Sequence, residues 1–203
     1  VGWVPLLDPD ETAKQLKKYT KNKYFKGVRH LIHEEEDPDW IVQDKVIEGL
    51  KVLADFNVPY DFVAIFPKHI KHVKTLVEKV PNLKIVIDHL AKPPIYEGTL
   101  NEQWAQYMEE LARYPQVYSK VSGLNTVCAD PDNWDYKELE PYIDFAVEKF
   151  GANRLMYGSD WPVADLAGDY LKVWKETNKA IEKLSEEEKE AILGKTAIEF
   201  YNL

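Results

Sequence analysis

Apolar and polar positions alternate along the chain in two different ways. Short apolar runs predict strands, and they cover residues 1–7, 27–32, 61–65, 83–90, 117–124 and 154–163. Between these runs, apolar residues recur every three or four positions, which is typical of amphipathic helices. Strand and helix therefore alternate six times. This order predicts parallel strands that are joined by helical crossovers.

Local signals mark several helix ends. Asp8-Pro9 and Asp37-Pro38 each predict a helix start, because Asp caps a helix and Pro fits its first position. Ser185-x-x-Glu188 has the pattern of a capping box and predicts another start. Gly151 follows an apolar helical stripe and predicts its end.

Two architectures fit the alternation, an open doubly wound sheet and a (β/α)8 TIM barrel. The absence of a G-x-G-x-x-G or P-loop motif argues against a doubly wound nucleotide-binding sheet. Residues with functional side chains cluster at the ends of different strands, which favours a barrel. They are Arg29, His30, His89, Lys92, Ser122 and Asp160.

Composition narrows the class of partner. The 203 residues suffice for a single domain with its own core. The formal charge of −9 argues against nucleic acid, and no apolar run reaches the ~20 residues of a membrane helix. Cys128 is the only cysteine, which fits a reducing compartment and predicts a cytoplasmic protein. We therefore expect a small-molecule substrate; the sequence leaves open whether the protein forms a homo-oligomer.

The stretch 154–163 carries the best-placed acid. Gly158 permits a close backbone approach, and Pro162 ends the ladder because it lacks an N–H. Asp160 then stands where the last strand opens into a loop, with Trp161 beside it. An acid at the C-terminal end of a barrel strand suits general-base work. The alternative is that Asp160 only caps the loop.

In each of the adjacent pairs Asp88/His89 and Arg29/His30, only one side chain can point into the barrel, because successive strand residues point to opposite faces. We expect His89 to point into the barrel, on the face of Ile85 and Ile87, and Asp88 to fix a neighbouring loop or helix end. We favour Arg29 over His30 as the inward residue of its pair. An inward Arg suits a carboxylate or an oxyanion.

The other candidates are weaker. His69 and His72 have the i, i+3 spacing of a metal pair, but they lie among lysines without an acid or Cys, so we expect an exposed helical turn. We also expect His33, within an acidic loop, to be solvated. Ser122 is not in a nucleophile elbow. Lys120, like Lys92, either binds an oxyanion or a sugar hydroxyl or is simply solvated.

Four segments together resemble the amidohydrolase-related metal-dependent hydrolases, and among them the sugar-acid lactonases of the L-fuconolactonase and L-rhamnonolactonase group. They are residues 27–30 (GVRH), 86–93 (VIDHLAKP), 120–124 (KVSGL) and 158–163 (GSDWPV). The resemblance extends over the whole chain. It implies a distorted (β/α)8 barrel and a hydrolase of carbohydrate metabolism that opens a lactone. Non-oxidative decarboxylases on the same barrel, and a non-catalytic barrel remnant, are the alternatives.

The resemblance also implies roles for residues. Asp160 matches the general base, and His89 the residue that binds the carbonyl or a metal. Arg29, Lys92 and Trp161 match positions around the substrate, and we place Ser122 with them.

The family's first strand bears an H-x-H pair that supplies metal ligands in members that use metal. This chain has no such pair, so we expect an N-terminally incomplete barrel without the first two strand–helix units. A divalent metal, zinc by preference, would have His89 and Asp160 as ligands. Whether this chain binds one stays open.

Overall fold

The computed structural model describes all 203 residues and centres on a parallel sheet. Its five strands are hydrogen-bonded in the order β1-β2-β3-β4-β5, the same as their order in the sequence. They are β1 (Val28–His30), β2 (Tyr60–Phe62), β3 (Ile85–Ile87), β4 (Val117–Val121) and β5 (Leu155–Tyr157). A doubly wound sheet reverses its order at a switch point, whereas a barrel does not. The sheet is therefore an open segment of a (β/α) barrel.

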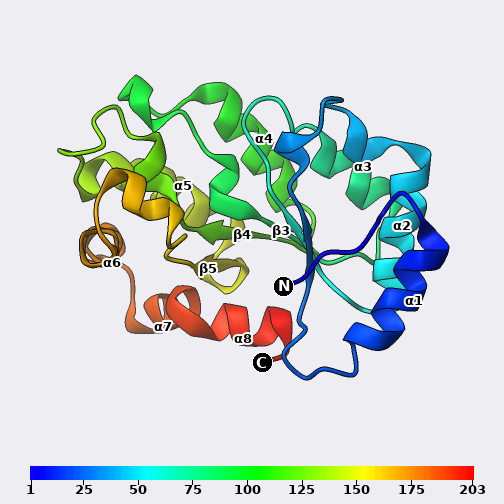
Figure 1. The fold of residues 1–203 in the computed structure, drawn as a ribbon. Coiled ribbons are helices and arrows are strands. Elements are labelled where there is room, and N and C mark those ends of the chain that lie inside the picture. The colour runs from blue at the N-terminus through cyan, green and yellow to red at the C-terminus, as the bar shows by residue number, and fades with distance from the viewer.

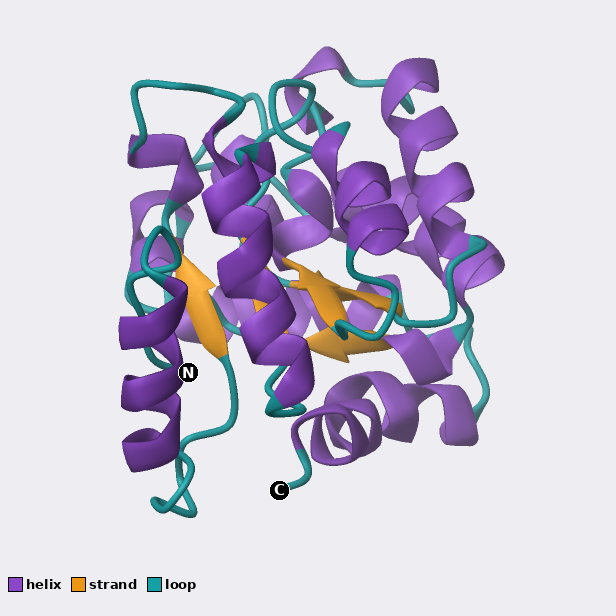
Figure 2. Cartoon of the chain, turned by 90° about the vertical axis from the view of Figure 1, so that its right-hand side faces the viewer, coloured by secondary structure: helices purple, strands orange, loops and turns teal.

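Helices follow the strands and surround them (Figures 1 and 2). They are α1 (Pro9–Tyr19), α2 (Asp44–Asp55), α3 (His72–Lys79), α4 (Glu102–Ala112), α5 (Tyr136–Phe150), α6 (Tyr170–Ala180), α7 (Glu186–Glu190) and α8 (Thr196–Tyr201). A π-helical turn, Ala191–Lys195, joins α7 to α8. No helix is both long enough and apolar enough to span a bilayer.

The two faces of the sheet differ in chemistry. Val28, Tyr60 and Ile85 are paired across three strands and pack with the helices in a core of 46 buried apolar residues. Arg29 and Asp61 pair on the opposite face, where only three buried apolar residues form a cluster. One of these three comes from α8, which lies along the lower side of the sheet in Figure 1. The second face is therefore largely polar, and it carries the candidate chemistry.

The first predicted strand, residues 1–7, is reduced to a single parallel bridge between Gly2 and Val28. The Gly2 N–H donates to Gly27, and the Gly2 carbonyl accepts from Arg29. Pro5 follows soon after and has no N–H to continue a ladder. The structure thus has five strands instead of the six that the pattern predicted.

Two of the three predicted helix starts are confirmed. Asp8 accepts a hydrogen bond from the Glu11 N–H at the start of α1, and Ser185 with Glu188 forms a reciprocal capping box at α7. The start at Asp37 was wrong. The Asp37 carboxylate accepts from the Asp39 N–H and from Gln43, and α2 begins only at Asp44.

Candidate active site

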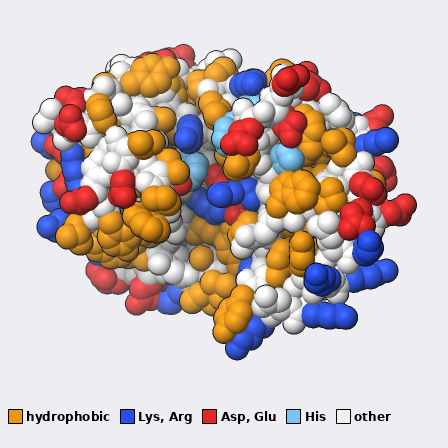
Figure 3. All heavy atoms as spheres, in the orientation of Figure 1, with side chains coloured by type: hydrophobic (Ala, Val, Ile, Leu, Met, Phe, Trp, Pro, Cys, Tyr) orange, Lys and Arg blue, Asp and Glu red, His pale blue; other side chains and the backbone are white.

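The carboxyl ends of the strands surround a cavity of about 320 Å³. Space-filling atoms show a hollow near the centre of the molecule, with basic and histidine side chains around it (Figure 3). The lining residues are Arg29, Leu31, His33, Glu34, Val63, Ile65, His89, Lys92, Asp160 and Val163. Arg29, His89, Lys92 and Asp160, four of the six site residues predicted from the sequence, therefore come together.

Asp160 follows β5 in a left-handed backbone conformation, with φ of +56°. One carboxylate oxygen, Oδ1, lies 3.6 Å from Nε2 of His89. The other oxygen is buried and has no hydrogen-bond partner in the protein. It lies over Gly123, where an added Cβ would be 2.6 Å from it. A glycine at this position is therefore what allows the carboxylate to sit against the end of β4.

His89 reaches the cavity because the backbone leaves the extended conformation directly after β3. Four consecutive residues from His89 to Lys92 have φ between +48° and +62°. The imidazole is 8% exposed, and its Nδ1 lies 2.8 Å from the Ser122 hydroxyl. Burial lowers the pKa of His89, against the raising effect of the Asp88 and Asp160 carboxylates. Burial thus favours the neutral imidazole.

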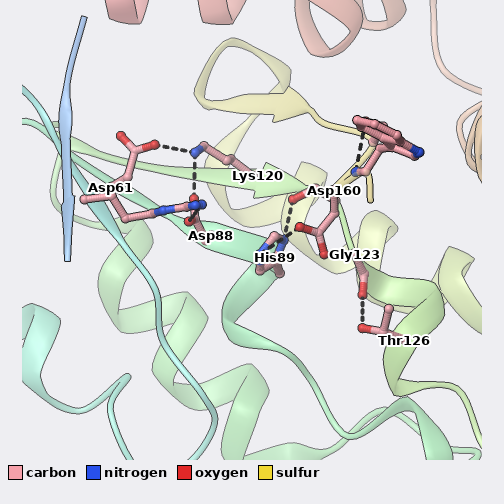
Figure 4. A network of polar contacts seen from close by, with 11 residues as sticks. Asp61, Asp88, His89, Lys120, Gly123, Thr126 and Asp160 are labelled. Carbon is pink, nitrogen blue, oxygen red and sulfur yellow. Dashed lines mark hydrogen bonds and ion pairs between the residues drawn. The ribbon is translucent and has the colours of Figure 1, made fainter. Parts of the chain in front are cut away.

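The prediction for Asp88 was wrong. Asp88 is fully buried in a chain of charges on the polar face of the sheet (Figure 4). Its Oδ1 lies 2.6 Å from Nζ of Lys120, and its Oδ2 accepts from Arg29 at 3.4 Å. Lys120 also binds Asp61 at 2.6 Å, and Asp61 accepts from the Tyr201 hydroxyl at 2.8 Å. The Ile85/Ile87 face, by contrast, packs against the helices.

Opposite charges compensate one another in this chain of charges. Burial lowers the pKa of Lys120, but the carboxylates of Asp88 and Asp61 outweigh it and raise that pKa overall. Burial raises the pKa of Asp61. The positive charge of Lys120 lowers this pKa, but burial has the larger effect. Lys120 is therefore a structural cation rather than a substrate contact or a solvated residue, and it separates two buried acids.

Arg29 and His30 point to opposite sides, and Arg29 is the residue of this pair that lines the cavity, as we favoured. The Arg29 guanidinium lines the cavity, where Asp88 holds it. His30 stacks on Trp40 with 4.1 Å between ring centroids, and its Nε2 lies 2.6 Å from Glu35. His30 is therefore a packing residue.

The remaining predicted site residues occupy different surroundings. Lys92 lines the cavity. The Trp161 side chain is 65% exposed and does not line it. Ser122 is buried behind the imidazole of His89, on the far side from the cavity. Among these three, only Lys92 lines the cavity.

The prediction that His69 and His72 are exposed was wrong. His69 is 1% exposed, and its Nδ1 accepts from the Ile65 N–H. His72 is also buried, and its Nε2 lies 3.0 Å from a carboxylate oxygen of Asp39. Burial lowers the pKa of His69 to about 4, with further lowering by Lys68. Both rings are therefore buried packing groups rather than exposed side chains.

Two ionisable residues of the cavity were not among the predicted site residues. His33 and Glu34 belong to a short 3-10 turn, Ile32–Glu34, that directly follows β1. His33 is exposed, as expected, yet it lines the cavity wall. Glu34 adds a second carboxylate to the cavity. The position of this acidic run, at the end of a barrel strand, is the signal that could have found them.

The donor set does not complete a metal centre. Catalytic zinc has three protein ligands and one open position. His89 and Asp160 supply two donors at the cavity, and no group of three or more His, Cys, Asp or Glu side chains in the chain is placed to hold a metal ion. The residues of this chain alone therefore do not fit a catalytic zinc site.

Comparison with known proteins defines the family. The Amidohydrolase family model matches residues 1–203. This chain belongs to the amidohydrolase family.

The chain is similar to two named lactonases and to a solved amidohydrolase structure. The L-fucono-1,5-lactonase of Burkholderia ambifaria is 39% identical over 171 residues, which make up 84% of this chain and 57% of that protein. The L-fucono-1,5-lactonase of Burkholderia multivorans is 32% identical over all of this chain and 71% of its own length. A crystal structure of a B. multivorans amidohydrolase with bound zinc has a TM-score of 0.91, at 31% identity, and this chain covers 72% of it. The chain thus spans less than two thirds of the B. ambifaria relative.

Proposed function

We propose that this chain forms the active-site face of a hydrolase that opens a sugar-acid lactone. The observation that carries the proposal is the pair formed by Asp160 and His89 at one cavity, with Arg29 and Lys92 on its wall. The two related L-fucono-1,5-lactonases support the choice of a lactone as substrate.

Asp160 is the proposed general base. Neither oxygen of its carboxylate accepts a hydrogen bond from the protein, because Nε2 of His89 is 3.6 Å away and Oδ2 has no partner. The carboxylate therefore keeps its capacity to accept a proton from water. Water attacks the lactone carbonyl carbon as Asp160 takes one of its protons.

The resulting oxyanion needs donors that are already in place. The Nε2 of His89 and the Arg29 guanidinium face the same cavity, and Asp88 restrains the guanidinium from behind. The bond between the carbonyl carbon and the ring oxygen then breaks. Asp160 returns its proton to that oxygen, so the product is an open-chain hydroxy acid and the base is regenerated.

The test is an assay of the purified protein with L-fucono-1,5-lactone and other aldonolactones, which follows acid release and subtracts the enzyme-free rate. We expect hydrolysis of one or more lactones. Aromatic carboxylates are tested in parallel for release of carbon dioxide. Turnover of carboxylates without lactones would assign a decarboxylase instead, and a folded protein inert toward both sets would contradict any hydrolytic role.

A further inference from the structure

Ser122 lies directly after β4, and its hydroxyl makes one side-chain hydrogen bond, to Nδ1 of His89 at 2.8 Å. Serine and imidazole are 6% and 8% exposed. The space beside Ser122 holds only about 10 Å³, too little for a ligand larger than a water molecule. The hydroxyl therefore acts on the histidine rather than on a substrate.

The two ring nitrogens of His89 face different groups. Nδ1 faces Ser122, and Nε2 faces the carboxylate of Asp160 at 3.6 Å. A neutral imidazole has one N–H and one lone pair. If Nε2 carried the lone pair, the Asp160 carboxylate would repel that lone pair. If Nε2 carries the proton, the carboxylate attracts the N–H. The ring proton therefore belongs on Nε2, and Nδ1 accepts a hydrogen bond from the Ser122 hydroxyl.

We propose that Ser122 is a positioning residue that donates its hydroxyl proton to Nδ1 and holds His89 as the Nε2–H tautomer. At 3.6 Å, the Nε2–H is too far from Asp160 to be used up in a hydrogen bond. It is therefore free to donate to a carbonyl oxygen in the cavity. His89 acts as a hydrogen-bond donor, and Asp160 alone acts as the base; this consequence rests on the proposed lactone hydrolysis.

Glycines flank the serine and the imidazole. A Cβ added at Gly158 would lie 3.3 Å from Cβ of Ser122, so a side chain at position 158 would crowd the serine. On the other side, a Cβ at Gly123 would lie 2.9 Å from Nδ1 of His89. The glycines on both sides allow the close contact between serine and imidazole.

The tautomer is measured directly by NMR of the full chain with 15N-labelled histidine, through two-bond couplings from ring protons to each nitrogen. The chain has five histidines, so a His89→Gln variant identifies the signal. We expect a protonated Nε2 and an unprotonated Nδ1. This readout requires no enzymatic activity, so it distinguishes failure of this proposal from failure of the proposed function.

Ser122→Ala removes the donor, and Ser122→Thr retains it. We expect Ser122→Ala to give a mixture of tautomers and to lower kcat for lactone hydrolysis about tenfold with KM unchanged, as for one lost hydrogen bond. Ser122→Thr should restore the wild-type spectrum. Ser119→Ala is the matched control, because Ser119 is also buried, lies in β4 three residues earlier, and donates to the Ile87 carbonyl instead. A protonated Nδ1 in the wild type, or an unchanged tautomer in folded Ser122→Ala, would overturn the proposal.

Discussion

Nε2 of His89 lies 3.6 Å from Oδ1 of Asp160, which is longer than a hydrogen bond. The two groups come from loops that follow β3 and β5. Each is held from behind, His89 by a hydroxyl and Asp160 by its position over Gly123. A substrate carbonyl and an attacking water therefore meet side chains whose directions are already set.

The first prediction concerns the base. Asp160→Asn keeps the shape of the side chain but removes its capacity to take a proton, so kcat for lactone hydrolysis should fall by roughly 10² to 10⁴. Steady-state kinetics measure this change. Asp165→Asn is a suitable control, since Asp165 is an exposed acid five residues further on. A loss of less than tenfold in folded Asp160→Asn would show that another group is the base.

The second prediction concerns the buried cation. Lys120→Met leaves the carboxylates of Asp61 and Asp88 without their shared partner, and the free energy of unfolding should fall by about 3 to 5 kcal/mol. Urea denaturation measures this loss. Lys14→Met removes an exposed partner of Glu11 and should cost no more than about 1 kcal/mol.

Adding Asp61→Asn to Lys120→Met removes one of the two buried acids that Lys120 had paired with. The double variant should therefore be more stable than Lys120→Met alone. Equal stability of the two variants would show that Lys120 acts through packing of its chain rather than through charge.

The third prediction concerns the glycine between the two site residues. In Gly123→Ala, the new methyl group would meet Asp160 Oδ2 at 2.6 Å and His89 Nδ1 at 2.9 Å, so the pair must separate. We expect at least a tenfold loss of kcat in addition to about 1 kcal/mol of backbone strain. Gly98→Ala is the control, because Gly98 also has positive φ but no atom within 4 Å of an added Cβ. Equal kcat in the two variants would contradict the steric argument.

The fourth prediction concerns stability toward acid. Burial in the folded state lowers the pKa of His69 to about 4, below the ordinary histidine value of 6.5. Below pH 6.5, the unfolded chain binds a proton that the folded chain excludes, so stability should decline down to about pH 4. The slope for one such proton is at most about 1.4 kcal/mol per pH unit.

His69→Asn tests this assignment, because its amide oxygen can still accept from the Ile65 N–H. Urea denaturation from pH 7 to pH 4 should show a smaller loss of stability in the variant than in the wild type. Parallel pH dependences in the two proteins would exclude His69 as the titrating group.

The order of the elements was predictable from periodicity, because buried strands and amphipathic helices leave clear patterns. Asp160, His89 and Arg29 were found for a related reason, since parallel strands bring their carboxyl ends to one side. The choice between Asp88 and His89 was not predictable. Strand alternation holds only while the backbone is extended, and the left-handed run from His89 contains no Gly or Asn to announce it.

The spacing of His69 and His72 indicated that they are buried, but the lysines next to them suggested an exposed turn. Positions 69, 72, 73, 76, 77 and 80 are buried and follow a helical repeat, so both histidines continue the apolar stripe of α3. The neighbours Lys68, Lys71 and Lys74 are exposed on the other side. Spacing was therefore a better guide here than the charge of adjacent residues.

The left-handed run from His89 to Lys92 has a consequence for how such a site can diversify. The backbone conformation of this run brings both His89 and Lys92 to the cavity wall. Replacing Lys92 would alter which substrate group is recognised without turning the imidazole. Removing one residue from the run would shift both directions together. Substrate preference can therefore change by substitution of side chains in this loop. The length of the loop cannot change without moving His89.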